Sequence, residues 1–266
     1  MKFGGTSVQD EEAIGRVVRI VKDKLEEHPL VVVSALARVT RLLCSLAQEA
    51  EARNGAKVRD LLGELRERHE TLAGHLLGKS PEIHRSALQD IDYRISSLES
   101  FVNGVCLIGE LSPRSEARII STGELLSSII VSYTFRAEGV SCNLADARKM
   151  VITDEHYMSA RPDLAATEAA VKREFAEVSK GVDIVVTQGF IATSFSGSTT
   201  VLGFEGSDYS AAIFAMALGA SRVEIWTDVD GIRTADPRMI PDTCRIERVS
   251  YDEAAVMASM GARVLH

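Results

Sequence analysis

The chain has 266 residues, of which 45% are hydrophobic and 26% are charged, and its formal net charge is −8. This length is sufficient for one large domain or two small ones with a substantial core. The acidic balance argues against a surface for nucleic acid or for an anionic membrane. An acidic chain that handles an anionic ligand must gather its positive charge locally, so lysines and arginines beside glycines are the candidates to follow.

Cysteine, histidine and hydropathy patterns narrow the class of protein further. The four cysteines lie far apart without a C-x-x-C pair, which is typical of reduced thiols in the cytosol. The six histidines show no metal-ligand spacing, so a structural zinc site is not expected. No apolar run approaches ~18 residues, and no signal peptide precedes the opening motif. We therefore expect a cytoplasmic protein without a membrane segment.

The opening stretch MKFGGTSV places Lys2 beside Gly4 and Gly5 and two hydroxyl residues. Glycines let backbone N–H groups approach an anion, and a lysine supplies the opposite charge, so the stretch suits a phosphate site. Its spacing differs from that of the P-loop, whose lysine follows the second glycine. An ordinary strand and turn before a helix is the alternative, and the stretch alone does not decide between them.

The rest of the first half alternates apolar and amphipathic segments. Residues 10–27 carry apolar side chains at three- and four-residue spacings, which predicts a helix. Residues 30–34 are a short apolar strand, typical of the middle of a parallel sheet. A loop with Ser34, Arg38 and Thr40 then leads to a second helix. Residues 52–105 are predicted to be helices without a chemical motif, one of which begins at Pro81, and we interpret them as a helical insertion.

The second half repeats the alternation of strands and helices. Helices are predicted over 117–139, 163–180 and the glycine-rich stretch 201–220. Strands are predicted over 139–147, 183–192 and 223–232, with a polar loop at 193–200. Such alternation predicts an α/β fold, a three-layer α/β/α sandwich with a mostly parallel central sheet. Ligands of such sheets bind at the carboxyl ends of the strands, where every polar cluster of this chain falls.

The stretch GFEGSDYSAA places Gly203 and Gly206 at a turn and Ser207 or Asp208 at the start of a helix. Serine and aspartate are favoured N-caps, so helix capping explains them. The alternative is a second anion-binding helix N-terminus, in which Asp208 positions a cation such as Lys2.

The stretch WTDVDGIRTADPR combines Asp228, Asp230 and Asp236 with Arg233 and Arg238. D-G and D-P pairs form turns, so a simple turn loop explains the aspartates. Arginines can also pair with phosphate oxygens, and the interleaved charges at a strand end therefore suit a nucleotide as well.

The stretch STGE ends in Glu124, a carboxylate inside an otherwise apolar helical run. This side chain either faces solvent or receives the ammonium group of a substrate.

Four motifs together resemble aspartate kinase, a member of the amino acid kinase superfamily. They are KFGGTS at Lys2–Ser7, STGE at Ser121–Glu124, GSDY at Gly206–Tyr209 and WTDVDG at Trp226–Gly231. The resemblance runs over the whole chain to its final GARVLH. The TDVDG and ADP elements are shared with other superfamily members, including glutamate and uridylate kinases, whereas KFGGTS and STGE point more narrowly to aspartate kinase.

The resemblance implies a fold, a reaction and its partners. Aspartate kinase transfers the γ-phosphate of ATP to the side-chain carboxylate of L-aspartate, giving 4-phospho-L-aspartate and ADP, the first step of lysine, threonine and methionine biosynthesis. We therefore expect the amino acid kinase fold, with L-aspartate and MgATP as partners, Mg²⁺ carried by the nucleotide, and a homo-oligomer. A carboxylate is already a nucleophile, so catalysis rests on positioning and charge neutralisation.

The resemblance also assigns roles to residues. Lys2 would stabilise the phosphoryl group in transit, and Asp208 would hold Lys2 in place. The implied substrate-binding residues are Gly4, Gly5, Ser34, Thr40, Glu124, Gly206 and Ser207, with Glu124 at the α-amino group. The implied nucleotide-binding residues are Lys2, Thr227, Asp228, Arg233, Arg238 and Arg263. No residue is implied as a metal ligand.

The resemblance further implies one catalytic domain over residues 1–266. Its amino-acid-binding lobe would cover about 1–180, with the helical insertion at 52–105, and its nucleotide-binding lobe about 181–266. The family normally continues through the rest of the kinase domain and a pair of regulatory ACT domains. We therefore expect the domain to be incomplete at its C-terminus.

Three positions depart from the family pattern. Phe204 stands where the family usually has the arginine that binds the α-carboxylate of aspartate, and we hypothesise that Arg38 or Arg41, which flank Thr40, replaces its charge. Arg263 stands at a position that is usually lysine, which keeps the charge but changes its geometry. Arg233 occupies a position that is often tyrosine.

Two other functions stay open at this point. Another amino acid kinase with a different acceptor is the nearest, because Phe204 alters the acceptor site. A catalytically degenerate nucleotide-binding module is the second, although the presence of both Lys2 and Asp208 argues against it.

Overall fold

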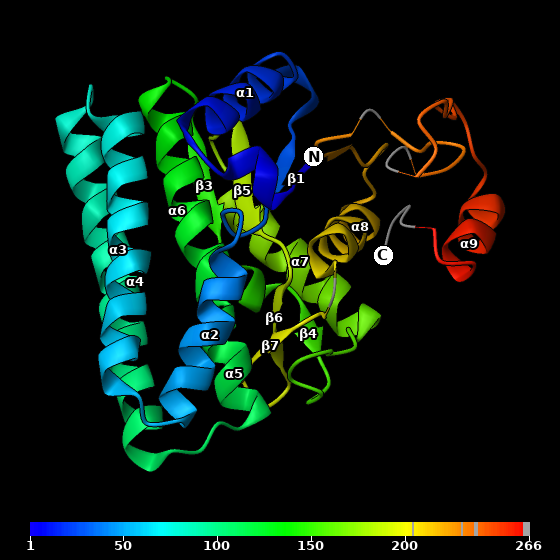
Figure 1. Ribbon diagram of the computed structural model, residues 1–266. Coiled ribbons are helices and arrows are strands. Elements are labelled where there is room, and N and C mark those ends of the chain that lie inside the picture. The colour runs from blue at the N-terminus through cyan, green and yellow to red at the C-terminus, as the bar shows by residue number, and fades with distance from the viewer. Residues whose placement is uncertain (204, 230, 237–238, 263–266) are drawn as a thin grey trace. The chain divides into compact units, whose positions relative to one another are not determined.

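The computed structural model of the chain is shown in Figure 1 and describes residues 1–203, 205–229, 231–236 and 239–262. The chain forms two compact units, Met1–Trp226 and Thr227–His266, and each is described by itself. Within the described residues, no helix combines the length and apolar character needed to cross a membrane.

Five strands of the larger unit form one sheet in the order β3-β5-β2-β1-β8. Their bounds are β1 Lys2–Phe3, β2 Leu30–Val33, β3 Cys142–Ala145, β5 Ile184–Gln188 and β8 Ile225–Trp226. Every pair of neighbours runs parallel. The carboxyl ends of all five strands therefore meet at one edge of the sheet, as the sequence predicted.

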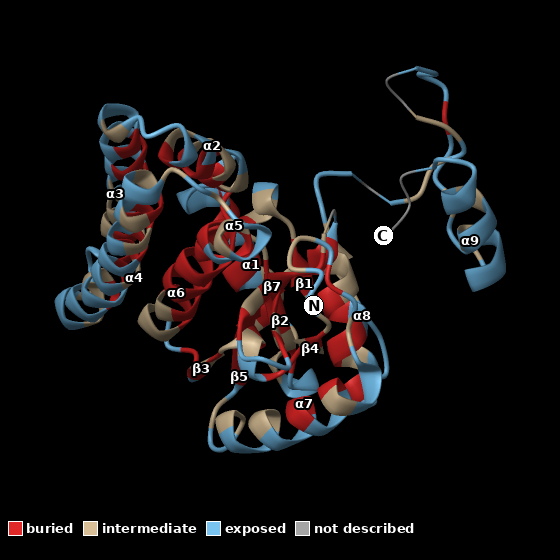
Figure 2. Ribbon diagram, turned by 90° about the horizontal axis from the view of Figure 1, so that it is seen from below, coloured by how far each residue is buried: buried red, intermediate tan, exposed pale blue. Residues whose placement is uncertain are grey.

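Helices cover both faces of this sheet. Val31 and Val33 of β2 join a core with α1 (Glu11–Lys22) and α6 (Thr122–Ala137). Val32, between them, joins a second core with α7 (Leu164–Val178) and α8 (Gly206–Leu218). Successive side chains of a strand point to opposite faces, so these valines separate the two faces of the sheet. Figure 2 shows buried residues concentrated in the sheet and on α6. The predicted three-layer α/β fold is confirmed.

The stretch that we interpreted as an insertion forms two long helices. They are α3 (Gly55–Leu77) and α4 (Pro81–Ile108), and α4 begins at the proline that the sequence indicated. In Figure 1 they stand side by side next to α6. Their apolar sides complete the core that also contains α1 and α2 (Val39–Glu51). The division into lobes near residue 180 stays a prediction.

Several element bounds differ from the predicted ones. The helix predicted over 10–27 ends at Lys22, and a 3-10 turn at Leu25–Glu27 follows it. The helix predicted over 117–139 consists of α5 (Pro113–Ile120) and α6, which meet at Ser121.

The polar loop predicted over 193–200 is confirmed only at 195–198, and its two ends are strands. Residues 195–198 form the turn of a hairpin between β6 (Ile191–Ser194) and β7 (Thr199–Val201), and this hairpin joins β4 (Ile152–Thr153) in a three-stranded sheet. Threonine favours strands because it is β-branched, and its hydroxyl can be buried when it is hydrogen-bonded. The hydroxyls of Thr153 and Thr200 lie 2.8 Å apart in this sheet, so the polarity of the segment did not exclude a strand.

The smaller unit contains α9 (Tyr251–Ser259), which Ser250 and Glu253 cap at its N-terminus. Its other described regular feature is a bridge between Arg233 and Arg245.

Candidate active site

Lys2 and Asp208 form an ion pair at the carboxyl end of the sheet. The lysine Nζ lies 2.5 Å from Oδ1 of the aspartate, which is in the first turn of α8. Lys2 is 9% exposed, and Oδ1 of Asp208 is buried with no other partner among the described residues. The structure thus brings together the two residues to which the resemblance gave catalytic roles. A lysine held this way presents a fixed positive charge where an anion can reach it.

The glycines that follow β1 allow close backbone contact with the end of β2. A Cβ on Gly5 would lie 2.9 Å from the carbonyl oxygen of Ala35, so a larger residue would push the two segments apart. The carbonyl of Gly5 accepts a hydrogen bond from the N–H of Ala37 at 3.1 Å. A Cβ on Gly4 would lie 3.7 Å from Nζ of Lys2. The turn at Gly4 and Gly5 therefore keeps Lys2 close to the loop that follows β2.

The N-terminus of α8 packs closely against the end of β5. A Cβ on Gly189 would lie 2.7 Å from Cβ of Ser207, a distance that real structures do not tolerate. The helix begins at Gly206, and the residue before it, Glu205, adopts a left-handed conformation (φ 56°) without a side-chain cap. The interpretation of Ser207 or Asp208 as an N-cap was therefore wrong, because both lie inside the first turn. Asp208 is thereby available to Lys2.

Glu124 is buried in the first turn of α6 and is 3% exposed, so the solvent-facing alternative was wrong. Its Oε1 accepts a hydrogen bond from the N–H of Ala35 at 3.3 Å, whereas its Oε2 is buried without a partner among the described residues. Burial raises the pKa of this carboxyl to about 8. Gly123 permits the close approach, since a Cβ there would lie 2.9 Å from Cβ of Ala35. A buried carboxylate oxygen without a donor suits a positively charged ligand group.

Ser34 and Thr40 belong to the loop and helix that follow β2. The carbonyl of Ser34 accepts a hydrogen bond from the hydroxyl of Ser127 on α6 at 2.7 Å. Thr40 is half-buried in the first turn of α2. Arg38 and Arg41 are both exposed, and the hypothesis that one of them replaces the usual arginine stays a prediction. Phe204 lies outside the described residues.

Apart from Lys2, the expected nucleotide-binding residues belong to the smaller unit, Thr227–His266. The hydroxyl of Thr227 donates to Oδ1 of Asp228 at 3.0 Å, and Nε of Arg233 donates to the hydroxyl of Thr243 at 3.1 Å. Their nucleotide contacts stay predictions. Asp230, Arg238 and Arg263 lie outside the described residues.

Several supporting residues were missed by sequence reasoning. Arg68 of α3 donates to the carbonyl of Ala37 at 2.7 Å and so connects the helical stretch to the loop after β2. Gln188, the last residue of β5, donates to the hydroxyl of Ser128 at 2.7 Å. Gly189 makes the close contact with α8 described above. None of these residues belongs to a recognisable motif, and only the chain's folding reveals their neighbours.

Comparison with known proteins gives close relatives over the whole chain. The family model described as "Amino acid kinase family" matches residues 1–266. Lysine-sensitive aspartokinase 3 of Escherichia coli is 38% identical over 266 residues, which cover 100% of this chain and 56% of that protein. The aspartokinase of Chlamydia trachomatis is 36% identical and is covered to 56%. The chain thus spans about half the length of these curated relatives.

Solved structures agree with the sequence comparison. The crystal structure of E. coli aspartokinase III in complex with aspartate and ADP (R-state) has a TM-score of 0.89 at 36% identity, and the match covers 100% of this chain and 57% of that one. The structure of the same enzyme with lysine and aspartate (T-state) has a TM-score of 0.86 at 35% identity. The similarity to aspartokinases that the motifs indicated is confirmed. Fold, site geometry and a family model that matches from the first residue to the last show that the chain belongs to the amino acid kinase family.

Proposed function

We propose that the chain acts as an aspartate kinase, which transfers the γ-phosphate of ATP to the side-chain carboxylate of L-aspartate and yields 4-phospho-L-aspartate and ADP. This reaction is the first step of lysine, threonine and methionine biosynthesis. The observation that carries the proposal is the Lys2–Asp208 ion pair, whose side chains are only 11% and 18% exposed, beside glycine backbone at the carboxyl end of the sheet. Aspartokinase relatives over the full chain, one of them solved with aspartate and ADP, support it.

The reaction brings two anions together, so its main physical obstacle is charge repulsion. The ammonium of Lys2 neutralises the phosphoryl oxygens as they pass to the acceptor, and Asp208 keeps that ammonium in position. The backbone N–H groups of Gly5 and Ser207 bind the same anions, whereas those of Gly4 and Gly206 donate to the carbonyls of Trp226 and Gly203, so these two glycines act by shaping the turns.

Glu124 binds the α-ammonium group of the acceptor. Its Oε2, which has no partner among the described residues, is a buried acceptor that a substrate ammonium satisfies, and this accounts for a carboxyl group inside an apolar helix. Ser34 and Thr40 lie near the same loop after β2 and complete the acceptor site with hydroxyl groups. Arg38 or Arg41 supplies the positive charge that binds the α-carboxylate of the acceptor.

ATP binds through Lys2, Thr227, Asp228, Arg233, Arg238 and Arg263. Mg²⁺ enters on the phosphates of the nucleotide, since this ion is usually held by substrate phosphates and one or two carboxylates. Among the described residues, no three His, Cys, Asp or Glu side chains gather as a metal site of their own. We place the protein in the cytoplasm and expect a homo-oligomer.

The test measures ADP release from MgATP with L-aspartate, with L-glutamate and without acceptor. We expect turnover with aspartate alone, and a fall of at least about 100-fold in kcat for Lys2→Ala, because one positioned charge of this kind contributes that much. Lys22→Ala is the matched control, since Lys22 pairs with Glu138 at the surface at 3.0 Å and should leave the rate unchanged. Equal turnover in Lys2→Ala and the parent chain would refute the role of the ion pair.

A different acceptor is the second candidate, because Phe204 stands where the family has arginine. Turnover with L-glutamate or another carboxylate, and none with aspartate, would establish it. ATP binding without turnover, restored by Phe204→Arg, would place the defect in the acceptor site. ATP binding without turnover in both proteins would favour a degenerate nucleotide-binding module.

A further inference from the structure

A small polar pocket lies beside the junction of α5 and α6, and its lining includes neither Lys2, Asp208 nor Glu124. Its volume is about 80 Å³, and α4, the α5–α6 junction and the 3-10 helix η3 (Ala147–Lys149) supply its walls. Three arginines and three hydroxyl residues line it: Arg94, Arg118, Arg148, Ser97, Ser121 and Thr122. We call it the arginine pocket. Three guanidinium groups around one small cavity stand out in a chain whose net charge is −8.

Two of the guanidinium groups keep their hydrogen-bond donors available. Cζ of Arg118 lies 4.1 Å from the centre of the Phe101 ring, a cation–π contact that occupies none of its N–H donors with a hydrogen bond. Cζ of Arg94 lies 5.7 Å from the ring centre of Tyr93. Within the part of the chain that the structure describes, neither guanidinium has a hydrogen bond or ion pair to a protein acceptor. The N–H donors of both arginines are therefore available to a ligand.

The third arginine has one carboxylate partner. Nε and Nη2 of Arg148 donate to the two oxygens of Asp146 at 2.9 and 2.6 Å. Burial acts to raise the pKa of Asp146, but the hydrogen bonds and charge of Arg148, with a contribution from the charge of Arg94, outweigh it and hold that pKa below its usual value. One carboxylate thus faces three guanidiniums, and the pocket keeps an excess of positive charge.

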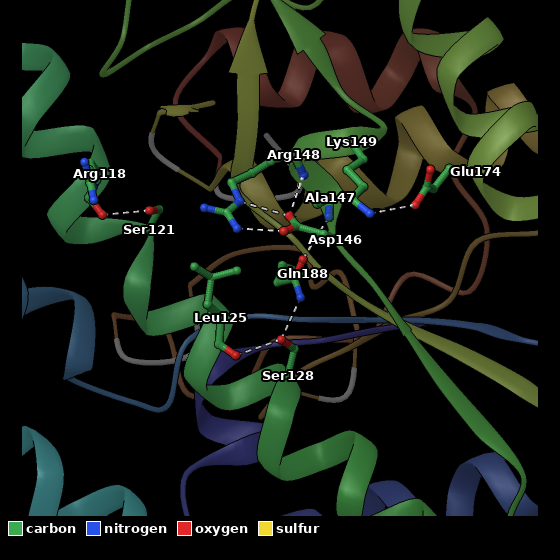
Figure 3. A network of polar contacts seen from close by, with 10 residues as sticks. All are labelled: Arg118, Ser121, Leu125, Ser128, Asp146, Ala147, Arg148, Lys149, Glu174 and Gln188. Atoms are coloured by element: carbon green, nitrogen blue, oxygen red, sulfur yellow. Dashed lines mark hydrogen bonds and ion pairs between the residues drawn. The ribbon is translucent and has the colours of Figure 1, made fainter. Parts of the chain in front are cut away.

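The turn that carries Arg148 is held in place by a hydrogen-bond network, shown in Figure 3. The N–H of Ala147 donates to Oε1 of Gln188 at 2.9 Å, and Nε2 of Gln188 donates to the hydroxyl of Ser128 at 2.7 Å. Ser128 in turn donates to the carbonyl of Leu125 on the same helix that lines the pocket. The pocket is therefore preorganised by β5 and α6, unlike a group of arginines on a loose surface loop.

Convergent guanidiniums repel one another, and an oxyanion relieves that repulsion while it accepts their planar sets of donors. The volume of about 80 Å³ compares with ~30 Å³ for one water in the liquid. This volume has room for one tetrahedral oxyanion. We propose that the arginine pocket binds a phosphate group, either as inorganic phosphate or as the end of a phosphate monoester, at a site separate from the proposed phosphoryl-transfer site.

The test titrates inorganic phosphate into the chain by calorimetry at low ionic strength, in the parent protein and in Lys2→Ala. The second protein weakens binding at the proposed transfer site and so isolates the arginine pocket. We expect binding to persist in Lys2→Ala and to weaken at least about tenfold on adding Arg94→Ala or Arg118→Ala, since each removes charge-assisted hydrogen bonds. Arg114→Ala is the matched control, because Arg114 is exposed on the same helix α5 and does not line the pocket.

Binding that disappears in Lys2→Ala, or that survives undiminished in both arginine variants, would overturn the proposal, as would an equal loss in Arg114→Ala. Thermal unfolding checks that each variant is folded. Arg118→Lys keeps the charge but loses the planar donor set, so an intermediate affinity is expected even if Arg118→Ala is unstable. Titration with glycerol 3-phosphate separates the two sources: competition with inorganic phosphate identifies a monoester site, and its absence identifies a site for the free ion.

Discussion

Replacing Glu124 by glutamine should remove a large part of the pH dependence of stability. The carboxyl group is fully buried, and burial raises its pKa from the ordinary 4.5 to about 8. Below pH 4.5 the group is protonated in the folded and the unfolded chain. Between pH 4.5 and about 8 only the folded chain holds the proton, so the free energy of unfolding falls as the pH rises. Above about pH 8 both states are ionised and the loss stays constant.

The magnitude follows from the difference between the two pKa values. A pKa change of one corresponds to ~1.4 kcal/mol, and the interval from 4.5 to about 8 therefore corresponds to about 5 kcal/mol of stability lost across that range. Glutamine has nearly the same shape and cannot ionise, so Glu124→Gln should keep its stability as the pH rises. The variant should gain on the parent chain by about 5 kcal/mol between pH 4.5 and pH 8.

Urea unfolding at pH 4.5, 6, 7 and 8 measures this difference directly. The comparison at each pH cancels the contribution of every other titrating group. Parallel curves for Glu124→Gln and the parent chain would refute the reasoning, because they would mean that the carboxyl titrates normally in the folded state. A gain already complete at pH 4.5 would show that the glutamine acts through packing and not through charge.

The same carboxyl should report on the proposed acceptor. An ammonium group beside Oε2 favours the ionised form of Glu124, so aspartate binding at pH 7 should release up to one proton from this residue. Calorimetric titration in two buffers with different ionisation enthalpies measures that proton. Equal heats in both buffers would contradict an ammonium contact at Glu124.

Other expectations concern the ion pair, the helix contact and a buried histidine. Asp208→Asn should lower stability by about 3 kcal/mol, measured by urea unfolding, since it leaves a largely buried ammonium without its carboxylate. Gly189→Ala should lower the free energy of unfolding by about 1–3 kcal/mol, because the added Cβ would collide with Ser207. Gly104→Ala should raise it by about 0.5–1 kcal/mol, because the added Cβ meets open space within the helix α4. The same unfolding assay compares the two variants. Burial lowers the pKa of His69 from 6.5 to about 4, so stability should fall by about 3 kcal/mol as the pH drops through that interval. His69→Leu should not show this loss of stability. The same fall in stability between pH 6.5 and about 4 in the variant and the parent chain would contradict the prediction.

Much of the fold could be predicted from local pattern. The apolar run at 30–33, the alternation of strands with amphipathic helices and the proline at 81 all indicated elements that the structure contains. The predicted helix boundaries were wrong at Ser121, where α5 ends and α6 begins, because the helical sequence pattern continues through this junction. The hairpin at 191–201 was missed because its threonines and serines are typical of loops. The sequence does not show that a buried hydroxyl such as that of Thr200 has a hydrogen-bond partner.

The site divides in the same way. The motifs KFGGTS, STGE and GSDY, together with WTDVDG, indicated the family. They also selected Lys2, Glu124 and Asp208, because residue type and short-range spacing can be read directly from the sequence. Burial of Glu124, its contact with Ala35 and its raised pKa arise from the packing of α6 against the loop after β2. Such contacts join residues that are remote in sequence, and no local pattern encodes the distance between them.

The arginine pocket is the clearest case of this difference. Arg94, Arg118 and Arg148 come from three separate elements, and each one alone reads as an ordinary solvated charge. Their charges add up only when α4, α5 and the turn after β3 meet around one cavity. Residue types and spacing thus establish which chemistry the chain can perform, whereas the assembly of remote segments sets the local charge and burial, because electrostatic energy depends on distance and on exclusion of water.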